Sequence, residues 1–193
     1  MPFIYKVANE TEKLGALALR NAIYAQEREY VPGDSLDAVA YQLVACTPER
    51  EVVACFRMVT QENRPFDLES FVSLEEILAS DSVPAEVGRL CVRTDYRYVA
   101  KGHFLHYGLF KISCLLAAKL GVTDFVMYTF GSLVRFYRGV HFIETGKRFF
   151  HPGYHETMHV MRLNFRSLAN EGSKPRSRLF RNLLSPDPNR FQI

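Results

Sequence analysis

The fold is decided by the stretch Glu86-Val-Gly-Arg-Leu-Cys-Val92, which leads through the turn Arg97-Tyr-Val-Ala-Lys-Gly102 into a long amphipathic segment. The first part has the apolar character of a buried strand. After the turn, leucine and isoleucine recur at helical spacing until Gly121, which predicts a helix over residues 102–120. A strand, a loop of small residues and a helix N-terminus attract anions, because backbone N–H groups and the helix dipole point at the same place. The sequence therefore predicts a phosphate-binding loop over residues 97–103.

The rest of the chain alternates helices and strands around this segment. Asn9 with Glu12 resembles a helix N-cap, and Pro32-Gly33 ends the apolar repeat that follows it. Two β-rich runs that are separated by a turn-like segment predict a hairpin, and two more such runs lie on either side of Pro152-Gly153. We expect strands at residues 41–46, 52–59, 86–92, 124–130, 142–150 and 157–165, and shorter helices at 74–78 and 132–138. This order predicts an α+β fold with a mixed sheet.

Length and composition favour one globular domain. The chain has 193 residues, 48% of them apolar and 23% charged, which is enough for a full core. We expect a domain over residues 1–168 and a basic C-terminal tail over 169–193, with a short helix near 179–184. All four cysteines lie in apolar runs without metal-ligand spacing, so we expect buried, reduced thiols. No run is long enough to span a membrane and no signal peptide is evident, so we expect a cytoplasmic protein.

Charge is distributed unevenly along the chain. Residues 1–86 carry a net charge of −8 and residues 87–193 a net charge of +11. A basic second half indicates an anionic partner, for which nucleic acid, lipid headgroups and an acidic carrier protein are the alternatives, unless it is only a solvated face. No helix concentrates arginines as a groove-reading element would, which argues against nucleic acid.

Two motifs together resemble the GNAT acyltransferases. The turn at residues 97–102 matches the pattern Arg/Gln-x-x-Gly/Ala-x-Gly/Ala of the donor site in that family, and residues 132–142 match its helix-to-strand segment ending in Tyr-x-x-x-Gly-Phe. Tyr137 occupies the tyrosine position of the second motif, and His141 replaces its glycine. The resemblance implies a GNAT fold, with a central mixed, mostly antiparallel sheet that is splayed at the donor-binding strand and flanked by helices.

The first half resembles a narrower branch, the acyl-homoserine-lactone synthases and the long-chain N-acyl amino acid synthases, including enzymes that make N-acyl tyrosine. The likeness covers residues 1–165. Two features differ from the lactone synthases, because Gly88 stands where serine is usual and the chain has no tryptophan. The N-acyl amino acid synthases are therefore the closer likeness. The matching residues are Arg20, Tyr24, Asp34, Asp37, Arg57, Glu86 and Arg89.

The resemblance implies a role for each of these residues in transfer of an acyl group to an amine. Glu86 would take the amine proton, and Tyr137 would protonate the departing thiolate. The acceptor carboxylate needs a cation, for which Arg20 and Arg57 are the candidates, and Tyr24 and Arg89 are further candidates for binding the acceptor. Donor-binding candidates, including the oxyanion donor near the bend of the strand, are Leu90, Cys91, Val92, Arg97, Ala100, Lys101, Gly102 and His103.

Each role has a structural alternative. Glu86 also fits a structural ion pair with Arg89 or Arg57. Arg20 and Tyr24, one turn apart, also fit an exposed helix pair, and Tyr137 also fits a core aromatic. No neighbour in sequence lowers the pKa of Cys91, so we do not expect an acyl-enzyme nucleophile.

The sequence also bears on the donor, the partners and metal binding. We expect no tightly bound cofactor, and as donor substrate the acyl-phosphopantetheine of acyl carrier protein, or else acyl-CoA. Lys101, Lys111, Lys119, Arg176 and Arg178 are the candidates for carrier docking. Twelve aromatic residues between Phe104 and Tyr154 include enough phenylalanines to line a groove for a medium or long acyl chain. His151, His155 and His159 are four apart, but Pro152-Gly153 breaks any helix there, so we expect no metal site.

The expected function is therefore N-acylation of an amino acid, with tyrosine as the acceptor suggested by the resemblance. Three alternatives remain. One is an acetyl-CoA-dependent acetyltransferase acting on a small amine, the second is an acyl-homoserine-lactone synthase, and the third is a non-catalytic module that binds lipid or nucleic acid.

Overall fold

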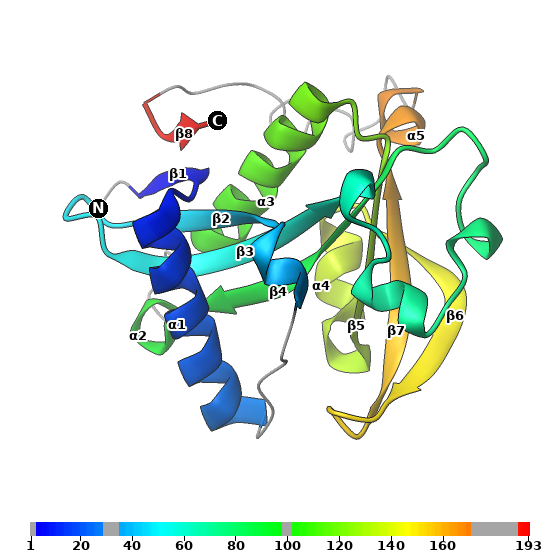
Figure 1. The fold of residues 1–193 in the computed structure, drawn as a ribbon, viewed down its shortest axis with the longest axis horizontal. Helices are drawn as coiled ribbons and strands as arrows, with labels where there is room; N and C mark the ends of the chain where they lie inside the picture. Colours follow the sequence, from blue (N-terminus) through cyan, green and yellow to red (C-terminus); the bar gives the residue numbers. More distant parts are fainter. Residues whose placement is uncertain (1–2, 29–34, 98–101, 171–188) are drawn as a thin grey trace. The chain divides into compact units, whose positions relative to one another are not determined.

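The computed structural model describes residues 3–28, 35–97, 102–170 and 189–193 (Figure 1). The helices are α1 (Glu10–Arg28), α2 (Thr94–Arg97), α3 (Gly102–Leu120), α4 (Val134–Gly139) and α5 (Phe165–Asn170). The strands are β1 (Ile4–Val7), β2 (Tyr41–Cys46), β3 (Val52–Thr60), β4 (Pro84–Val92), β5 (Asp124–Phe130), β6 (Ile143–His151), β7 (Glu156–Asn164) and β8 (Phe191–Gln192). Short 3-10 turns include η3 (Asp67–Ser70), η4 (Leu74–Glu76) and η5 (Gly131–Leu133).

The strands form one mixed sheet in the order β6-β7-β5-β4-β3-β2-β1-β8. Neighbours run antiparallel in the pairs β1–β2, β2–β3, β5–β7 and β6–β7, and parallel in the pairs β1–β8 and β4–β5. The expected mixed, mostly antiparallel sheet flanked by helices is therefore confirmed. Each strand predicted from the sequence is present, with ends that differ by at most a few residues.

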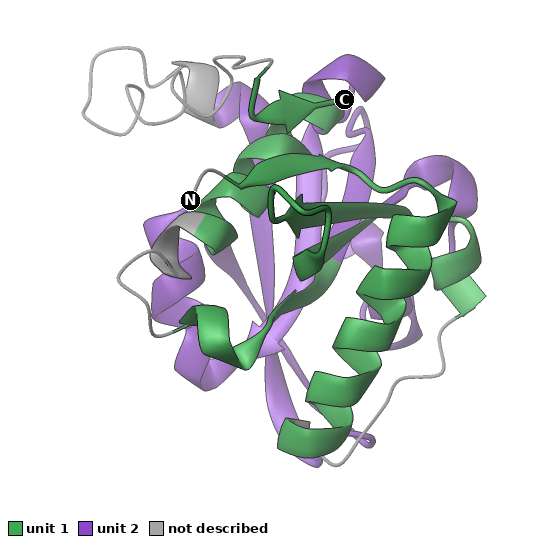
Figure 2. Ribbon diagram, turned by 90° about the vertical axis from the view of Figure 1, so that its left-hand side faces the viewer, with its two compact units in different colours: residues 1–58, 88–116, 183–193 green, residues 59–87, 117–182 purple. Residues whose placement is uncertain are grey.

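The chain divides into two compact units (Figure 2). Unit 1 comprises residues 1–58, 88–116 and 183–193, and unit 2 comprises residues 59–87 and 117–182. Strands β3 and β4 each contain residues of both units. The expected domain boundary at residue 168 falls inside α5 and stays a prediction.

In unit 1, α1 begins at a reciprocal cap that the sequence predicted. The Glu12 backbone N–H donates to Asn9 Oδ1 at 2.9 Å, and the Asn9 backbone N–H donates to Glu12 Oε2 at 3.0 Å. Such caps satisfy N–H groups that lack a partner inside the helix. From there α1 places Ala16 and Ile23 on a core to which β2, β3 and β4 contribute Val44, Cys46, Cys55 and Cys91. All four cysteines of the chain are buried and free, as expected.

The start and end of the chain add two strands of unit 1 that the sequence pattern did not predict. β1 pairs with β2, and β8 pairs with β1 through Tyr5 and Phe191, whose rings stack at 5.1 Å. Both strands are short, so neither shows a readable alternation of apolar and polar residues. Phe191–Gln192 lie within the segment expected as a tail.

Helix α3 approaches β1 closely enough to require a glycine. A Cβ built at Gly108 would lie 2.0 Å from Cζ of Tyr5, which is almost fully buried. We expect G108A to lower the free energy of unfolding by about 1–3 kcal/mol through overpacking, although alanine favours a helix. The matched control is G15A in α1, where the new Cβ would meet Val52 at an ordinary 3.5 Å. Urea denaturation should show G15A unchanged or stabilised, and equal effects of the two variants would contradict the packing argument.

In unit 2, β5, β7 and β6 form an antiparallel ribbon that holds the segment between β3 and β4. The buried Asp124 accepts hydrogen bonds from Arg162 Nε at 2.7 Å and Asn164 Nδ2 at 2.8 Å, and Arg162 also donates to the Ile77 carbonyl. Burial alone would raise the pKa of Asp124, but these hydrogen bonds lower it. The charged cluster therefore fixes the start of β5 against β7 and against the end of the 61–83 segment.

The sheet is splayed at β4. β4 and β5 pair from Pro84 with Asp124 to Glu86 with Val126. These pairs involve only the first residues of each strand. Three residues after Glu86, Arg89 adopts φ +56° inside the strand. A non-glycine residue in this left-handed region breaks the regular pleat, as in a β-bulge. The splay expected at the donor-binding strand is therefore present.

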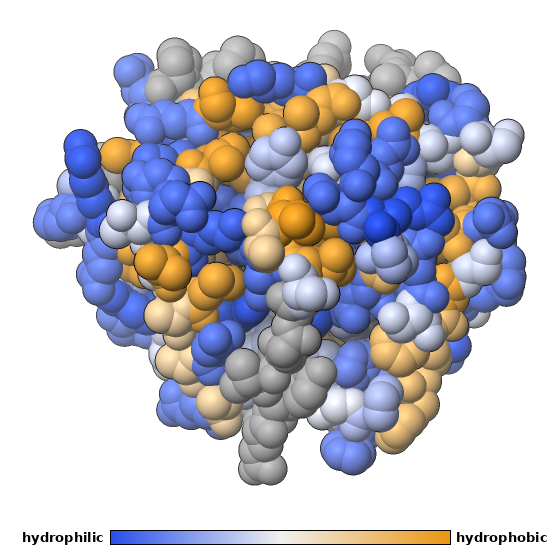
Figure 3. Space-filling view, viewed as in Figure 1, coloured by the Kyte–Doolittle hydropathy of each residue, from blue (hydrophilic) through white to orange (hydrophobic). Residues whose placement is uncertain are grey.

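The surface is mixed in character. Large exposed apolar side chains occur in both units, among them Leu14, Ile143 and Phe150. Figure 3 shows apolar groups scattered among hydrophilic ones on the face in view, as is usual for folded proteins. Among the described residues, no helix is both long and apolar enough to cross a membrane.

Candidate active site

Glu86 is a buried carboxylate at the place where the pairing of β4 and β5 stops. Its side chain is 3% exposed, and its Oε2 accepts the backbone N–H of Leu68 at 2.7 Å. Leu68 lies in turn η3, also in unit 2. A buried carboxylate must be hydrogen-bonded to remain charged, and this N–H supplies part of that stabilisation. Sequence reasoning identified Glu86 but missed Leu68, because a backbone donor leaves no sequence signal.

Strand β4 carries two further candidates beyond Glu86. Arg89 is half-buried and holds the left-handed conformation, whereas its neighbour Gly88 does not. A Cβ built at Gly88 meets no described atom within 4 Å, so the serine usual in the resembling synthases would fit here. Leu90 is half-buried, while Cys91 and Val92 are buried.

Two buried arginines of unit 1 share one carboxylate. Arg20 on α1 is 3% exposed and donates to Asp37 from both terminal nitrogens, with NH1 at 2.8 Å. Arg57 on β3 is 2% exposed and donates to the same carboxylate at 3.5 Å. Gln42 Nε2 also donates to Asp37, at 3.3 Å. Against the effect of burial, Asp37 raises the pKa of Arg20, so this guanidinium stays charged. The alternative of Arg20 in an exposed helix pair is therefore wrong.

Arg20 keeps one buried donor that Asp37 does not take up. Asp37 takes up the terminal nitrogens of Arg20, whereas the buried Nε of Arg20 has no hydrogen-bond partner within the described ranges. The charge of Arg89 also acts on Arg20. An anionic group such as a carboxylate would be attracted to this cluster. Asp34, the other acid of the expected loop, lies outside the described residues.

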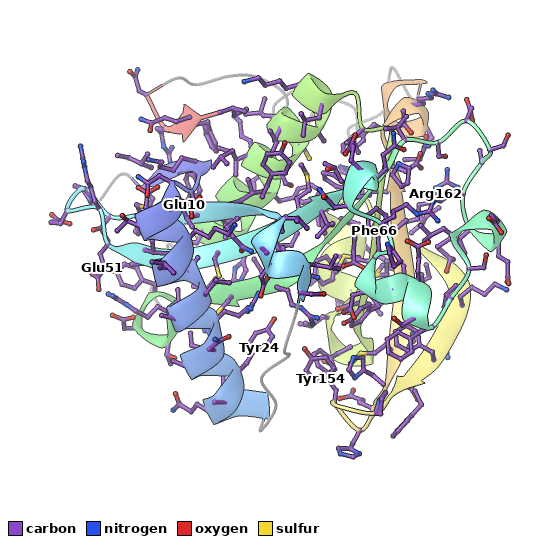
Figure 4. All side chains as sticks on the ribbon, in the orientation of Figure 1. Glu10, Tyr24, Glu51, Phe66, Tyr154 and Arg162 are labelled. Carbon is purple, nitrogen blue, oxygen red and sulfur yellow. The ribbon has the colours of Figure 1, made fainter. Side chains whose placement is uncertain are left out.

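Tyr24 is one turn from Arg20 on α1. It is half-buried and packs against the core cluster beneath the helix, and Figure 4 shows it projecting from α1. The structure therefore places Arg20 and Tyr24 on the inward side of the helix, where the sequence left an exposed pair open.

The donor loop is described only in part. Ala100 and Lys101 lie outside the described residues, and α3 begins at Gly102 with His103 next to it, as the sequence predicted. Arg97 binds protein groups, because its Nε donates to the Val92 carbonyl at 2.7 Å and its NH1 to Glu27 on α1. This arginine therefore secures the end of β4 immediately before the loop.

Cys91 has neighbours that the sequence did not suggest. The thiol of Cys55, from β3, lowers the pKa of Cys91 through a hydrogen bond, and the charges of Arg97 and Arg20 act in the same direction, against burial. These groups left no signal in the sequence, because Cys55 and Arg20 come from distant parts of the chain. Cys91 itself is only 3% exposed and belongs to the core under α1.

Tyr137 is buried at the end of α4. It is 6% exposed, its ring packs edge-on against Phe136 and Phe142, and burial raises its pKa. It is therefore protonated at neutral pH, as a proton donor must be, although a weak acid. His141 adopts φ +74°, so the turn keeps the glycine conformation of the motif in spite of the histidine.

The carrier-docking candidates have different surroundings. Lys111 Nζ lies 4.6 Å from the centre of the Phe191 ring and so contacts β8, and Lys119 is exposed at the end of α3. Arg176 and Arg178 lie outside the described residues. Part of the basic excess is also paired within each unit with acids of the first half, in Arg93–Glu51, Arg97–Glu27, Lys147–Glu76 and Arg166–Asp81.

The three spaced histidines make separate contacts. His151 Nδ1 accepts the backbone N–H groups of Gly153 and Tyr154, His155 is exposed, and His159 lies 3.3 Å from Glu144. Among the described residues, no group of three or more His, Cys, Asp or Glu side chains has a geometry that would hold a metal ion.

Comparison with known proteins agrees with this fold. Residues 19–105, which include Arg20, Arg57, Glu86 and Arg89, match the model of the family described as acetyltransferase (GNAT) domain. The chain has the GNAT fold, an α+β N-acyltransferase architecture. No sequence among the curated proteins matches the chain.

Similar solved structures include three synthases. FeeM, an N-acyl amino acid synthase from uncultured soil microbes, is similar with a TM-score of 0.72 and 15% identity, over 86% of this chain and 94% of that one. BjaI, a CoA-dependent acyl-homoserine lactone synthase in complex with SAM and isopentyl-CoA, is similar with a TM-score of 0.70 and 16% identity, over 99% and 93%. The acyl-homoserine lactone synthase LasI is similar with a TM-score of 0.64 and 13% identity, over 84% and 89%.

Proposed function

We propose that this chain is a cytoplasmic N-acyltransferase that moves a medium- or long-chain acyl group from acyl carrier protein to the α-amino group of an amino acid, with tyrosine as the first acceptor to test. The observation that carries the proposal is Glu86, a buried carboxylate at the point where β4 and β5 of a GNAT fold stop pairing. The likeness to an N-acyl amino acid synthase supports the choice of product.

The chemistry requires the amine to lose a proton and the thiolate to gain one. Glu86, directly or through a water molecule, takes the proton from the acceptor ammonium, and the freed amine attacks the thioester carbonyl. A backbone N–H near residues 90–92 stabilises the oxyanion that forms. The C–S bond then breaks, the amide forms, and Tyr137 protonates the leaving thiolate. No cofactor other than the acyl thioester enters this reaction.

The acceptor carboxylate is assigned to the arginine cluster. Arg20, Arg57 and Arg89 carry three positive charges, and Asp37 is the carboxylate bound to the first two. Arg20 Nε is a buried donor that an acceptor carboxylate would satisfy. Its terminal fork already binds Asp37, so Nε is the contact that Arg20 itself offers, and Arg57 and Arg89 are the other candidates for the acceptor carboxylate.

The donor is tested by comparing thioesters of one chain length. With tyrosine as acceptor, dodecanoyl-carrier protein is expected to give a higher kcat/KM than dodecanoyl-CoA, and acetyl-CoA a much lower one. Raising the salt concentration from about 50 to 500 mM should reduce the rate with the carrier several-fold and change the rate with CoA less, because salt screens protein docking. Equal rates with both dodecanoyl donors, or no effect of salt, would contradict carrier docking, and preference for acetyl-CoA would contradict the long-chain assignment.

CoA as donor is the second candidate, because the similar synthase BjaI is described as CoA-dependent. The same comparison decides between the two donors. The experiment uses the full chain, so that the docking candidates Arg176 and Arg178 are present.

The role of Tyr137 as proton donor predicts a moderate effect. Y137F is expected to lower kcat by about 10-fold or more with a donor that has a poor leaving group, while the packing against Phe142 is kept. Rates with oxygen-ester and thioester donors separate the alternatives, since a proton donor matters more for the worse leaving group. If Y137F lowers both rates equally, Tyr137 is a core residue only. F136L, which alters the same aromatic contact, serves as the packing control.

A further inference from the structure

We infer that Tyr128 and Asp67 are positioning residues that hold Glu86 through the backbone of turn η3. The inference rests on the proposed role of Glu86 as the base. Both residues belong to unit 2, as do Glu86 and Leu68. The chain of contacts runs from the ring of Tyr128 to its hydroxyl, to Asp67, to the N–H of Leu68 and finally to Glu86.

Turn η3 meets Glu86 through a donor that the surrounding core holds in place. The Leu68 N–H donates to Glu86 Oε2 at 2.7 Å, and the Leu68 side chain is fully buried. Phe66, just before the turn and labelled in Figure 4, is 1% exposed. A shift of the Leu68 N–H would therefore move the buried side chains of Leu68 and Phe66. Close packing of the core resists such a movement.

Two of the polar contacts of the turn differ in environment. Arg64 and Glu69 form a surface pair, with Arg64 Nε 3.0 Å from Glu69 Oε2, and exposed pairs of this kind contribute little. The Tyr128 hydroxyl donates to Asp67 Oδ2 in a partly buried site, where a hydrogen bond to a charged group is stronger. Tyr128 is therefore the contact that ties the turn to β5.

Aromatic rings pack around the Tyr128 side chain and so fix the direction of its hydroxyl. Tyr128 meets Phe149 edge-on at 5.4 Å and Phe71 edge-on at 6.4 Å, while Phe71 and Phe149 stack at 4.2 Å. His151 lies 5.7 Å from Tyr128, and its Nδ1 accepts two backbone N–H groups, so that this nitrogen carries no proton. Figure 4 shows Tyr154, which lies 4.5 Å from His151, at the ends of β6 and β7.

This arrangement has a consequence for the titration of the base. An N–H aimed at a carboxylate favours its charged form and fixes the direction of its lone pairs. Loss of the Tyr128–Asp67 bond would let the turn relax, so Glu86 would take up a proton at higher pH and face the amine less well. The titratable side chains of this chain of contacts are Tyr128 and Asp67, and Asp67 precedes Leu68, whose backbone N–H donates to Glu86.

The test compares Y128F with Y107F. Tyr107 is a matched control because its hydroxyl has no hydrogen-bond partner within the described part of the chain. We expect the acid limb of the pH profile of kcat to move up by about 0.5–1 pH unit in Y128F and to stay in place in Y107F. D67A should behave as Y128F does, D67N should stay near wild type because its amide oxygen still accepts the hydroxyl, and the double variant Y128F/D67A should shift no further.

A second readout does not depend on activity. In protein labelled with ¹³C at glutamate carboxyls, the Glu86 resonance, assigned by its absence in E86Q, should titrate at higher pH in Y128F than in Y107F. Unchanged titration in Y128F, or shifts of Y128F and D67A that add in the double variant, would overturn the inference. If E86Q instead keeps full turnover while this shift is observed, the proposed base is wrong and the positioning contact is right.

Discussion

Replacing Glu86 with Gln is expected to lower kcat by about 10²- to 10⁴-fold while leaving donor binding unchanged. A glutamine cannot take a proton from the acceptor ammonium, and positioned general bases contribute rate factors of this size. The amide oxygen of glutamine still accepts the Leu68 N–H, so the strand and turn η3 keep their contact. The measurement is single-turnover acyl transfer from a dodecanoyl donor to tyrosine, together with donor affinity by calorimetry.

The control for this result is E49Q, at an exposed glutamate of the β2–β3 hairpin. It makes the same chemical change without touching β4. Turnover of E86Q within about threefold of E49Q would remove Glu86 from the role of base. Loss of donor binding in E86Q would show that the residue holds the donor and would leave the deprotonation step without a candidate.

Replacing Asp37 with Ala is expected to be the most destabilising of the substitutions considered, by about 3–5 kcal/mol of unfolding free energy. Arg20 and Arg57 are almost fully buried, and Asp37 is the carboxylate that hydrogen-bonds to both. Removing it takes a shared carboxylate away from two buried guanidinium groups, which costs far more than loss of a surface pair. D37N should fall between D37A and wild type, since its amide keeps the size and one acceptor oxygen.

Urea denaturation of D37A beside D95A provides the test. Asp95 pairs with Arg93 but is 61% exposed, so its loss should change the stability by less than about 1 kcal/mol. Equal effects of the two variants would mean that Arg20 and Arg57 do not depend on Asp37. A gain in stability for D37A would mean that water reaches the cluster.

Local signals in the sequence were enough for most of the fold. The reciprocal cap of Asn9 and Glu12, the apolar repeat of α3 that stops at Gly121 and the β-rich runs on either side of Pro152-Gly153 each depend on residues close in the chain. Helix caps and side-chain periodicity are short-range effects, so they can be read without the partner. The resemblance to the GNAT fold added the splay at β4, which no local pattern indicates.

The sequence also identified Glu86, Arg20 and Arg57, but it could not say what each of them touches. The groups that lower the pKa of Cys91 come from β3, α1 and α2, and these elements meet only in the folded chain. The net charge of the two halves likewise does not say which charges pair, and pairs such as Arg166–Asp81 bring basic and acidic residues together.

The sequence by itself determined the elements, their order and the candidate base, because these follow from caps, periodicity and motif spacing along the chain. Only the tertiary structure decided that Asp37 serves two buried arginines and that the Leu68 N–H is aimed at Glu86. It also decided that Phe191 in β8 pairs with β1 at the edge of the sheet, and that Arg89 adopts φ +56° within β4. The physical reason is that burial, hydrogen-bond direction and charge pairing depend on the distance between atoms, and the residues that set these distances are 17 to 70 or more positions apart.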